Sequence, residues 1–173
     1  MRTYRTAFFT TLLFLLAAWP AVAQEANTVT ITPYVALGTA QASPVGVAVV
    51  FPLTSIFSLE TDVAYRRAEG GINALSMSSS LLCALPNLGT ARPYLAGGIG
   101  LSQYGAPIFS SSGSPIGTEP SLALTVNAGG GLTMPMNDAL GLRTDARWSQ
   151  SFGAHGSEQF RVAQGISFGL GRR

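Results

Sequence analysis

The chain has 173 residues, a length that suits one domain, and only 10% of them are charged. An ordinary soluble domain has about 25% charged residues, so this chain has too few charges to coat a soluble surface. Its ten basic residues are all arginine and the formal net charge is +2, with no basic cluster, which argues against nucleic-acid binding. A single cysteine, Cys83, excludes an internal disulfide and a cysteine-based zinc site.

Residues 1–23 have the pattern of a cleavable secretory signal peptide. A positive n-region, an apolar h-region and a small-x-small cleavage site follow one another: Arg2 and Arg5, residues 7–18, and Ala21-Val22-Ala23. The apolar run is shorter than the ~20 residues of a spanning helix, so cleavage is favoured over a retained membrane anchor. The mature chain, residues 24–173, is then one domain with eight arginines, eight acidic residues and no net charge.

The remaining sequence alternates apolar residues with small or polar ones, which predicts β-strands. In the clearest strand, an apolar face that begins at Phe57 alternates with a face that carries Glu60, Asp62 and Arg66. Gln164 is the one polar misfit on the apolar face of the last strand. Eight strands are predicted, at about residues 28–40, 44–52, 57–67, 73–85, 92–104, 121–134, 139–149 and 159–170.

The composition of the two faces predicts which one points into the fold. The polar faces are mostly Gly, Ala and Ser with a few charges, which suits the narrow interior of an eight-stranded barrel. The apolar faces carry Leu, Val, Ile and aromatic residues, whereas a soluble lipocalin-like barrel would turn such a face inward. Backbone groups in lipid must all be paired, so the sheet must close. We therefore expect an all-β, eight-stranded antiparallel up-and-down transmembrane barrel.

Aromatic residues on the apolar faces lie near the strand ends. Phe57 and Tyr65 are eight residues apart, as are Phe160 and Phe168. For tilted strands this spacing covers roughly 21 Å of membrane height, close to the ~25 Å apolar band of such barrels. Chance placement of ordinary strand aromatics is the alternative. The predicted girdle has Phe51, Phe57 and Phe168 at one end, and Tyr65, Trp148 and Phe160 at the other.

Connection lengths predict the orientation of the barrel. The short connections contain Pro or Asn and lie on the side of both termini: Leu53–Ile56, Pro86–Ala91 and Pro135–Asp138. On the other side, Gly105–Pro120 is long and rich in Ser, Gly and Pro, and Ser151–Glu158 is intermediate. Short turns are periplasmic and long loops external in outer-membrane barrels. The Gly105–Pro120 loop, with Ile108 and Phe109 at its tip, is the candidate contact surface, unless it is a loop without a partner.

Four segments are similar to a known family: Arg92–Gly100, Asn127–Leu132, the turn Met136-Asn137-Asp138, and the Leu140–Trp148 strand. They resemble the small eight-stranded bacterial outer-membrane β-barrels around OmpX and the membrane domain of OmpA. The resemblance implies an outer-membrane location and a monomer with a packed interior. It also implies contact with outer-membrane lipid and lipopolysaccharide, and assembly by the barrel-assembly machinery with periplasmic chaperones. Members usually end on an aromatic residue, whereas here Phe168 is followed by Gly169–Arg173.

Charged residues on the polar faces form the candidate interior network: Glu60, Asp62, Arg66, Arg143, Asp145, Arg147 and Arg161. The third and seventh strands lie opposite each other in an eight-stranded barrel, so long side chains can meet across the lumen. We interpret the set as a near-neutral, salt-bridged plug, because a packed interior of this size leaves no continuous channel. The alternative is an ion pathway or a general acid/base pair, since charges within a membrane are functional candidates.

Two other residues are candidates for chemistry. His155 and Ser157 form a His-x-Ser sequence that is similar to the pair of lipid A deacylases of the PagL type. Such hydrolysis needs a nucleophile, a base and an orienting acid, and no acidic residue follows Glu158. A solvated loop histidine is therefore favoured. Cys83 lies on an apolar face, where we expect a small lipid-facing residue and not a reactive thiol.

The sequence thus favours a non-enzymatic outer-membrane barrel that contributes to envelope integrity or to surface interaction through its loops. No cofactor or metal site is indicated. A lipid A-modifying hydrolase that uses His155 and Ser157 is the first alternative. A small pore or a transporter of hydrophobic ligands is the second.

Overall fold

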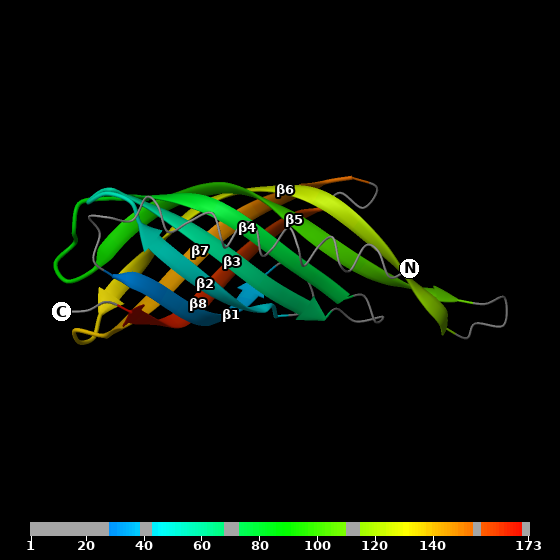
Figure 1. The fold of residues 1–173 in the computed structure, drawn as a ribbon, viewed down its shortest axis with the longest axis horizontal. Helices are drawn as coiled ribbons and strands as arrows, with labels where there is room; N and C mark the ends of the chain where they lie inside the picture. The colour runs from blue at the N-terminus through cyan, green and yellow to red at the C-terminus, as the bar shows by residue number, and fades with distance from the viewer. Residues whose placement is uncertain (1–27, 39–42, 68–72, 110–114, 154–156, 171–173) are drawn as a thin grey trace.

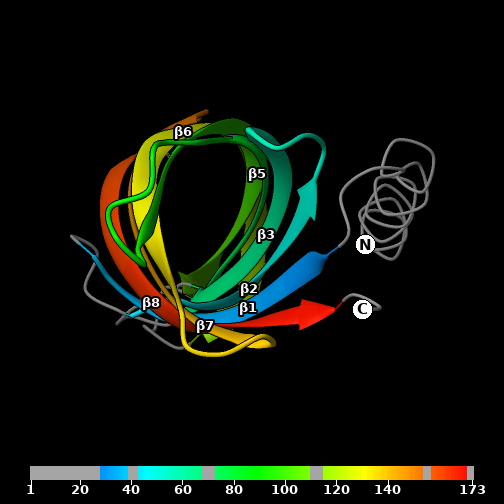
Figure 2. The same ribbon diagram turned by 90° about the vertical axis from the view of Figure 1, so that its left-hand side faces the viewer.

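The computed structural model describes residues 28–38, 43–67, 73–109, 115–153 and 157–170. In these residues the chain forms one closed antiparallel barrel in which each strand pairs with its neighbours in sequence. The first strand also pairs with the last, which closes the ring seen end-on in Figure 2. The strands are β1 (Val29–Gly38), β2 (Val45–Pro52), β3 (Phe57–Arg67), β4 (Asn73–Ala84), β5 (Arg92–Phe109), β6 (Pro115–Pro135), β7 (Leu140–Phe152) and β8 (Glu158–Leu170). The predicted eight-stranded up-and-down barrel is confirmed.

Strand alternation sorts the side chains onto two unlike faces. The outer face carries large apolar residues such as Leu37, Leu95 and Ile99, which are 73%, 55% and 64% exposed. The inner face holds buried alanines together with hydroxyl and charged residues: Ala36, Ala48, Ala64, Ala163, Thr32, Glu60, Ser80 and Arg147 are examples. This arrangement is the inverse of a soluble protein and matches the predicted lipid-facing exterior. Within the described ranges no helix is long and apolar enough to cross a membrane.

Three short connections lie at one end of the barrel, which we call the turn end; β1 begins and β8 ends there (Figure 1). Side chains stabilise two of these turns by accepting backbone hydrogen bonds. Thr54 Oγ1 accepts from the Phe57 amide at 2.9 Å, and Asn137 Oδ1 accepts from the Leu140 amide at 2.8 Å. Gly89 supplies the positive φ of 63° in the third turn. The predicted short turns are thus built from Asn, Thr and Gly, each in its usual role.

The opposite end, which we call the hairpin end, differs from the expectation. The composition of Gly105–Pro120 predicts a long loop, but most of this segment is paired strand. The β5–β6 ladder continues from Gly105↔Pro120 to Ile108↔Gly117 and, after a bulge, to Phe109↔Pro115. The two arms project beyond the other strands in Figure 1. The Ser, Gly and Pro content indicates a loop. Among the described residues, however, β4 pairs with β5 only as far as Gly105, and β7 pairs with β6 only as far as Leu124. The arms beyond these points have no described strand on their outer sides, and proline is tolerated in such edge positions.

Candidate functional site in the barrel interior

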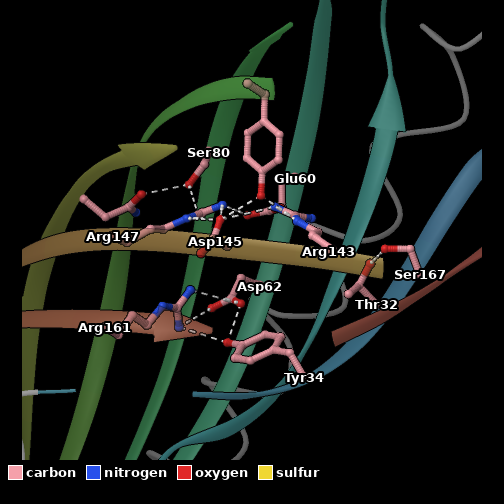
Figure 3. Close-up of polar contacts among 12 residues, drawn as sticks. Thr32, Tyr34, Glu60, Asp62, Ser80, Arg143, Asp145, Arg147, Arg161 and Ser167 are labelled. Atoms are coloured by element: carbon pink, nitrogen blue, oxygen red, sulfur yellow. Dashed lines mark hydrogen bonds and ion pairs between the residues drawn. The ribbon is translucent and has the colours of Figure 1, made fainter. Parts of the chain in front are cut away.

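Strands β3 and β7 bring four buried charges together, which we call the central ion cluster: Glu60, Arg143, Asp145 and Arg147 (Figure 3). Arg147 Nη2 lies 2.5 Å from Glu60 Oε1 and 2.9 Å from Asp145 Oδ2. Arg143 Nη2 pairs with Glu60 Oε2 in an electrostatic contact that lacks hydrogen-bond geometry, and lies 3.4 Å from Asp145 Oδ2. Two guanidinium groups and two carboxylates therefore neutralise each other across the lumen.

Side chains from three further strands complete this cluster. Arg147 Nη1 donates to Ser80 Oγ of β4 at 3.3 Å, and Ser80 Oγ donates to Asn127 Oδ1 of β6 at 3.0 Å. Arg143 Nε donates to the Tyr94 hydroxyl of β5 at 2.7 Å. Residues from every strand between β3 and β7 thus meet in one layer. A buried polar layer is stable only when its polar atoms have hydrogen-bond or ion-pair partners. The contacts described here provide such partners for most of the polar atoms in the layer.

A second buried group lies beside the first and joins β1, β3 and β8 (Figure 3). The Tyr34 hydroxyl donates to Asp62 Oδ2 at 2.5 Å and accepts from Arg161 Nη1 at 2.9 Å. Arg161 Nη2 lies 3.4 Å from the same carboxylate oxygen. This group, too, contains one cation and one anion and carries no net charge. A cavity of about 20 Å³ lies between the two groups. One water needs about 10–15 Å³, so the cavity has room for a single water.

The two groups repeat one arrangement of Arg, Tyr and Asp. In the central ion cluster the Tyr94 hydroxyl donates to Asp145 Oδ2 at 3.0 Å, as Tyr34 does to Asp62. The Arg143 guanidinium carbon lies 4.8 Å from the centre of the Tyr94 ring, and that of Arg161 lies 5.2 Å from the Tyr34 ring. These distances allow cation–π attraction. Each tyrosine therefore satisfies an arginine and a carboxylate at once, and fills the lumen with its ring.

Glycines opposite the tyrosines make the arrangement sterically possible. A methyl group at Gly46 would overlap the Tyr34 hydroxyl, and one at Gly131 would overlap the Tyr94 hydroxyl. Gly165 leaves similar room beside the Tyr34 Cβ. The glycines of these strands are thus packing residues for two large interior rings.

Hydroxyl groups continue the polar interior towards the hairpin end. Ser102, Thr125, Ser151 and Tyr104 share a chain of hydrogen bonds of 3.1, 3.2 and 3.1 Å in that order. The sequence places Ser151 in the loop Ser151–Glu158, but it is a buried residue of β7, because this strand continues to Phe152. Towards the turn end, Thr32 and Ser167 share a hydrogen bond of 2.8 Å.

The structure brings six of the seven candidate interior charges into these two groups: Glu60, Asp62, Arg143, Asp145, Arg147 and Arg161. Arg66 lies nearer the hairpin end, and no carboxylate of the described residues lies within ion-pair distance of it. The tyrosines are the part that sequence reasoning missed. Their position was detectable, since Tyr34 alternates in phase with Thr32 and Ala36 on the inward face of β1.

The six predicted girdle aromatics lie on the outward phase of their strands. Trp148 is paired by register with Phe160 near the hairpin end, and Phe168 with Leu140 near the turn end. Trp148 Nε1 donates to Glu158 Oε1 at 2.6 Å, and the Tyr65 hydroxyl donates to Asn73 Oδ1 at 3.0 Å. Rings with one polar atom bonded and the rest apolar suit the boundary between lipid and water.

The candidates for hydrolysis are not assembled within the described residues. His155 lies outside them. The Ser157 hydroxyl accepts a hydrogen bond from Gln159 Nε2 at 3.2 Å, while the Glu158 carboxylate is held by Trp148 on the outer face. Ser157, just before β8, is half-buried and bonds to Gln159, whereas Glu158 is exposed and bonds to Trp148, so this acid and this hydroxyl have different partners. Cys83 lies opposite Phe57 of β3 and Leu95 of β5 in the strand register. Both of these side chains face outward, so Cys83 lies on the predicted lipid-facing side.

No protein-family model and no curated protein sequence matches the chain. Several solved structures share its fold. Neisserial surface protein A matches with a TM-score of 0.63 and 9% identity, covering 82% of this chain and 94% of that one. The N-terminal β-barrel domain of Pseudomonas aeruginosa OprF matches with a TM-score of 0.59 and 17% identity, covering 83% of this chain and 98% of that one. A major outer membrane protein of Thermus thermophilus matches with a TM-score of 0.62 and 10% identity, covering 82% of this chain and 99% of that one.

The closed sheet, the apolar outer face and the internal charges define the class of this protein. It is an eight-stranded transmembrane β-barrel with the fold of bacterial outer-membrane proteins. The predicted resemblance to the OmpX and OmpA membrane-domain class is confirmed at the level of the fold, and the outer membrane is where such a barrel belongs.

Proposed function

We propose that the protein is a non-enzymatic outer-membrane barrel with a packed, salt-bridged interior. Its role is to contribute to envelope integrity or to surface interaction through its external hairpin. The observation that carries this proposal is the central ion cluster, in which Glu60 of β3 pairs with Arg143 and Arg147 of β7. These side chains cross the middle of the lumen and neutralise one another, which is what a structural plug requires.

The projecting hairpin supports a surface role. Strands β5 and β6 continue together beyond the ends of β4 and β7, so the hairpin stands clear of the barrel wall (Figure 1). Ile108, near its end, is 42% exposed. A rigid scaffold that holds out a binding segment is a common way for loops to carry function. We place the hairpin on the external side, following the convention that short turns are periplasmic.

The surroundings of the barrel follow from its outer face. Outer-membrane lipid and lipopolysaccharide contact the exposed apolar wall, and we expect a monomer. The signal peptide at residues 1–23 directs export, and the barrel-assembly machinery and periplasmic chaperones then insert the chain. These partners are implied by the class of fold and by the predicted signal.

Three measurements on the purified protein and on expressing cells separate this proposal from its alternatives. Planar-bilayer recordings should show no steady conductance; a steady conductance that changes in Arg147→Ala would indicate a pore. The mass spectrum of lipid A should be unchanged by expression of the protein; a mass shift that disappears in His155→Ala would indicate a hydrolase.

Deleting residues 106–119 tests the surface role. The deletion should leave the barrel folded but remove any cell-surface binding that the intact protein confers, whereas a surface role of the hairpin is excluded if that binding persists.

A further inference from the structure

A polar cavity lies between the central ion cluster and the hairpin end, and we call it the vestibule. Its volume is about 90 Å³, several times the 10–15 Å³ or so that one water requires. The residues around it run from Arg147 and Arg161, in the middle of the barrel, to Gly38, Pro44 and Gln159 at the strand ends. The vestibule therefore reaches the rim of the barrel at the hairpin end.

The vestibule wall holds more positive than negative charge. Three arginines and one carboxylate line it: Arg66, Arg147, Arg161 and Asp62. Arg147 is neutralised by the central ion cluster, and Arg161 by Asp62. Arg66 is half-buried on the inward phase of β3, opposite buried Ala74 of β4. Because no described carboxylate pairs with it, the excess charge of the vestibule is that of Arg66.

Hydroxyl groups also line the vestibule, and most of them already bond to other groups in the wall. Serine hydroxyls from three strands face the vestibule: Ser76 and Ser78 of β4, Ser102 of β5, and Ser149 and Ser151 of β7. The Asp62 carboxylate already accepts from Tyr34 and Arg161, so the wall offers little to a cation. A guanidinium group presents a planar fork of donors that fits two oxygens of one anion.

We propose that the vestibule binds a small oxyanion from the external solution, with Arg66 as its anchoring residue. The hydroxyl of Ser78, which makes no hydrogen bond to the described residues, supplies a further donor for the bound group. The closed wall separates the vestibule from membrane lipid, so the ligand is a soluble phosphate, sulfate or carboxylate group and not a lipid headgroup. The wall also lowers the local dielectric constant, which strengthens the attraction between Arg66 and an anion relative to bulk water.

The neighbouring residue provides a matched control. Arg67 carries the same charge one position further along β3, but it lies on the outward phase and is exposed. Arg66→Gln and Arg67→Gln therefore remove the same charge from the chain, and only the first removes it from the vestibule. We would titrate inorganic phosphate into the full-length protein in detergent micelles at constant ionic strength and follow binding by calorimetry.

The proposal predicts saturable binding that weakens at least about tenfold in Arg66→Gln and changes less than about twofold in Arg67→Gln. Unchanged heat-modifiable gel mobility of both variants would show that each is folded. Should Arg66→Gln fail to fold, Arg66→Lys is the substitute, which keeps the charge but loses the planar fork and should weaken binding. Absence of saturable binding, equal binding in all variants, or equal losses in Arg66→Gln and Arg67→Gln would overturn the proposal.

Discussion

Arg147 of β7 reaches Glu60 of β3 through the middle of the barrel, with 2.5 Å between Nη2 and Oε1 and both side chains almost completely buried. The pair belongs to a cluster in which cations and anions balance, so neither charge stands alone in the low-dielectric interior. Removing one partner of a buried pair leaves the other uncompensated, which costs more than the pair itself contributes. Stability should therefore depend on keeping the balance and less on any one contact.

Glu60→Gln tests this balance, because it keeps the shape of the side chain and removes its charge. The variant leaves two arginines with Asp145 alone, and we expect it to lower the free energy of unfolding by about 3–5 kcal/mol. Urea unfolding of the refolded protein in detergent, followed by tryptophan fluorescence, measures the change. The double variant Glu60→Gln with Arg147→Gln restores neutrality and should recover part of the loss. A double variant that loses the sum of both single changes would contradict the account.

The tyrosine hydroxyls should contribute measurably to stability. Tyr34→Phe removes the group that joins Arg161 to Asp62, and should lower the free energy of unfolding by about 1–3 kcal/mol, since the buried polar partners lose a bond. Tyr65→Phe is the matched control, because its hydroxyl donates to Asn73 at an exposed position, and should change stability by less than about 0.5 kcal/mol. Equal effects of the two variants would show that the interior hydroxyl has no special role.

Interior glycines should not tolerate a methyl group. In Gly131→Ala the new Cβ would overlap the Tyr94 hydroxyl and the Thr144 backbone oxygen, so we expect a loss of about 1–3 kcal/mol. Gly97→Ala is the control, because the nearest atom to its added Cβ is 4.0 Å away. The same unfolding assay compares the two. If Gly97→Ala were the more damaging variant, the packing described around Tyr94 would be wrong.

Gln164 is exposed on the outer face of β8, beside Val35 and Thr144 by register, and its amide has no hydrogen-bond partner among the described residues. An unsatisfied amide in lipid is unfavourable, so Gln164→Leu should raise the free energy of unfolding in lipid vesicles by about 1 kcal/mol. Gln159→Leu, which changes an inward residue bonded to Ser157, should not raise it. A stability loss in Gln164→Leu would show that this face contacts something other than lipid.

Much of the fold was predictable from the alternation of residue types, because strand geometry places every second side chain on the same face. That pattern located both faces, the short turns and the inward phase of Glu60 and Arg147. It did not predict the hairpin, since the sequence between Gly105 and Pro120 has the composition of a loop and its pairing depends on two arms in register. The alternation also did not distinguish Arg66, which has no described ion-pair partner, from the paired interior arginines. It shows which side chains point inward, but ion pairing also requires the two charges to lie at the same level along the barrel axis.

Gel mobility after membrane fractionation tests the central claim most directly. A closed barrel in the outer membrane should be recovered from the outer-membrane fraction, and an unboiled sample in detergent should migrate differently from a boiled one, because the folded barrel resists the detergent until heated. We expect this shift for the protein, and we expect Glu60→Gln to lose it at a lower temperature. Recovery in the soluble fraction, with the same mobility before and after boiling, would contradict it.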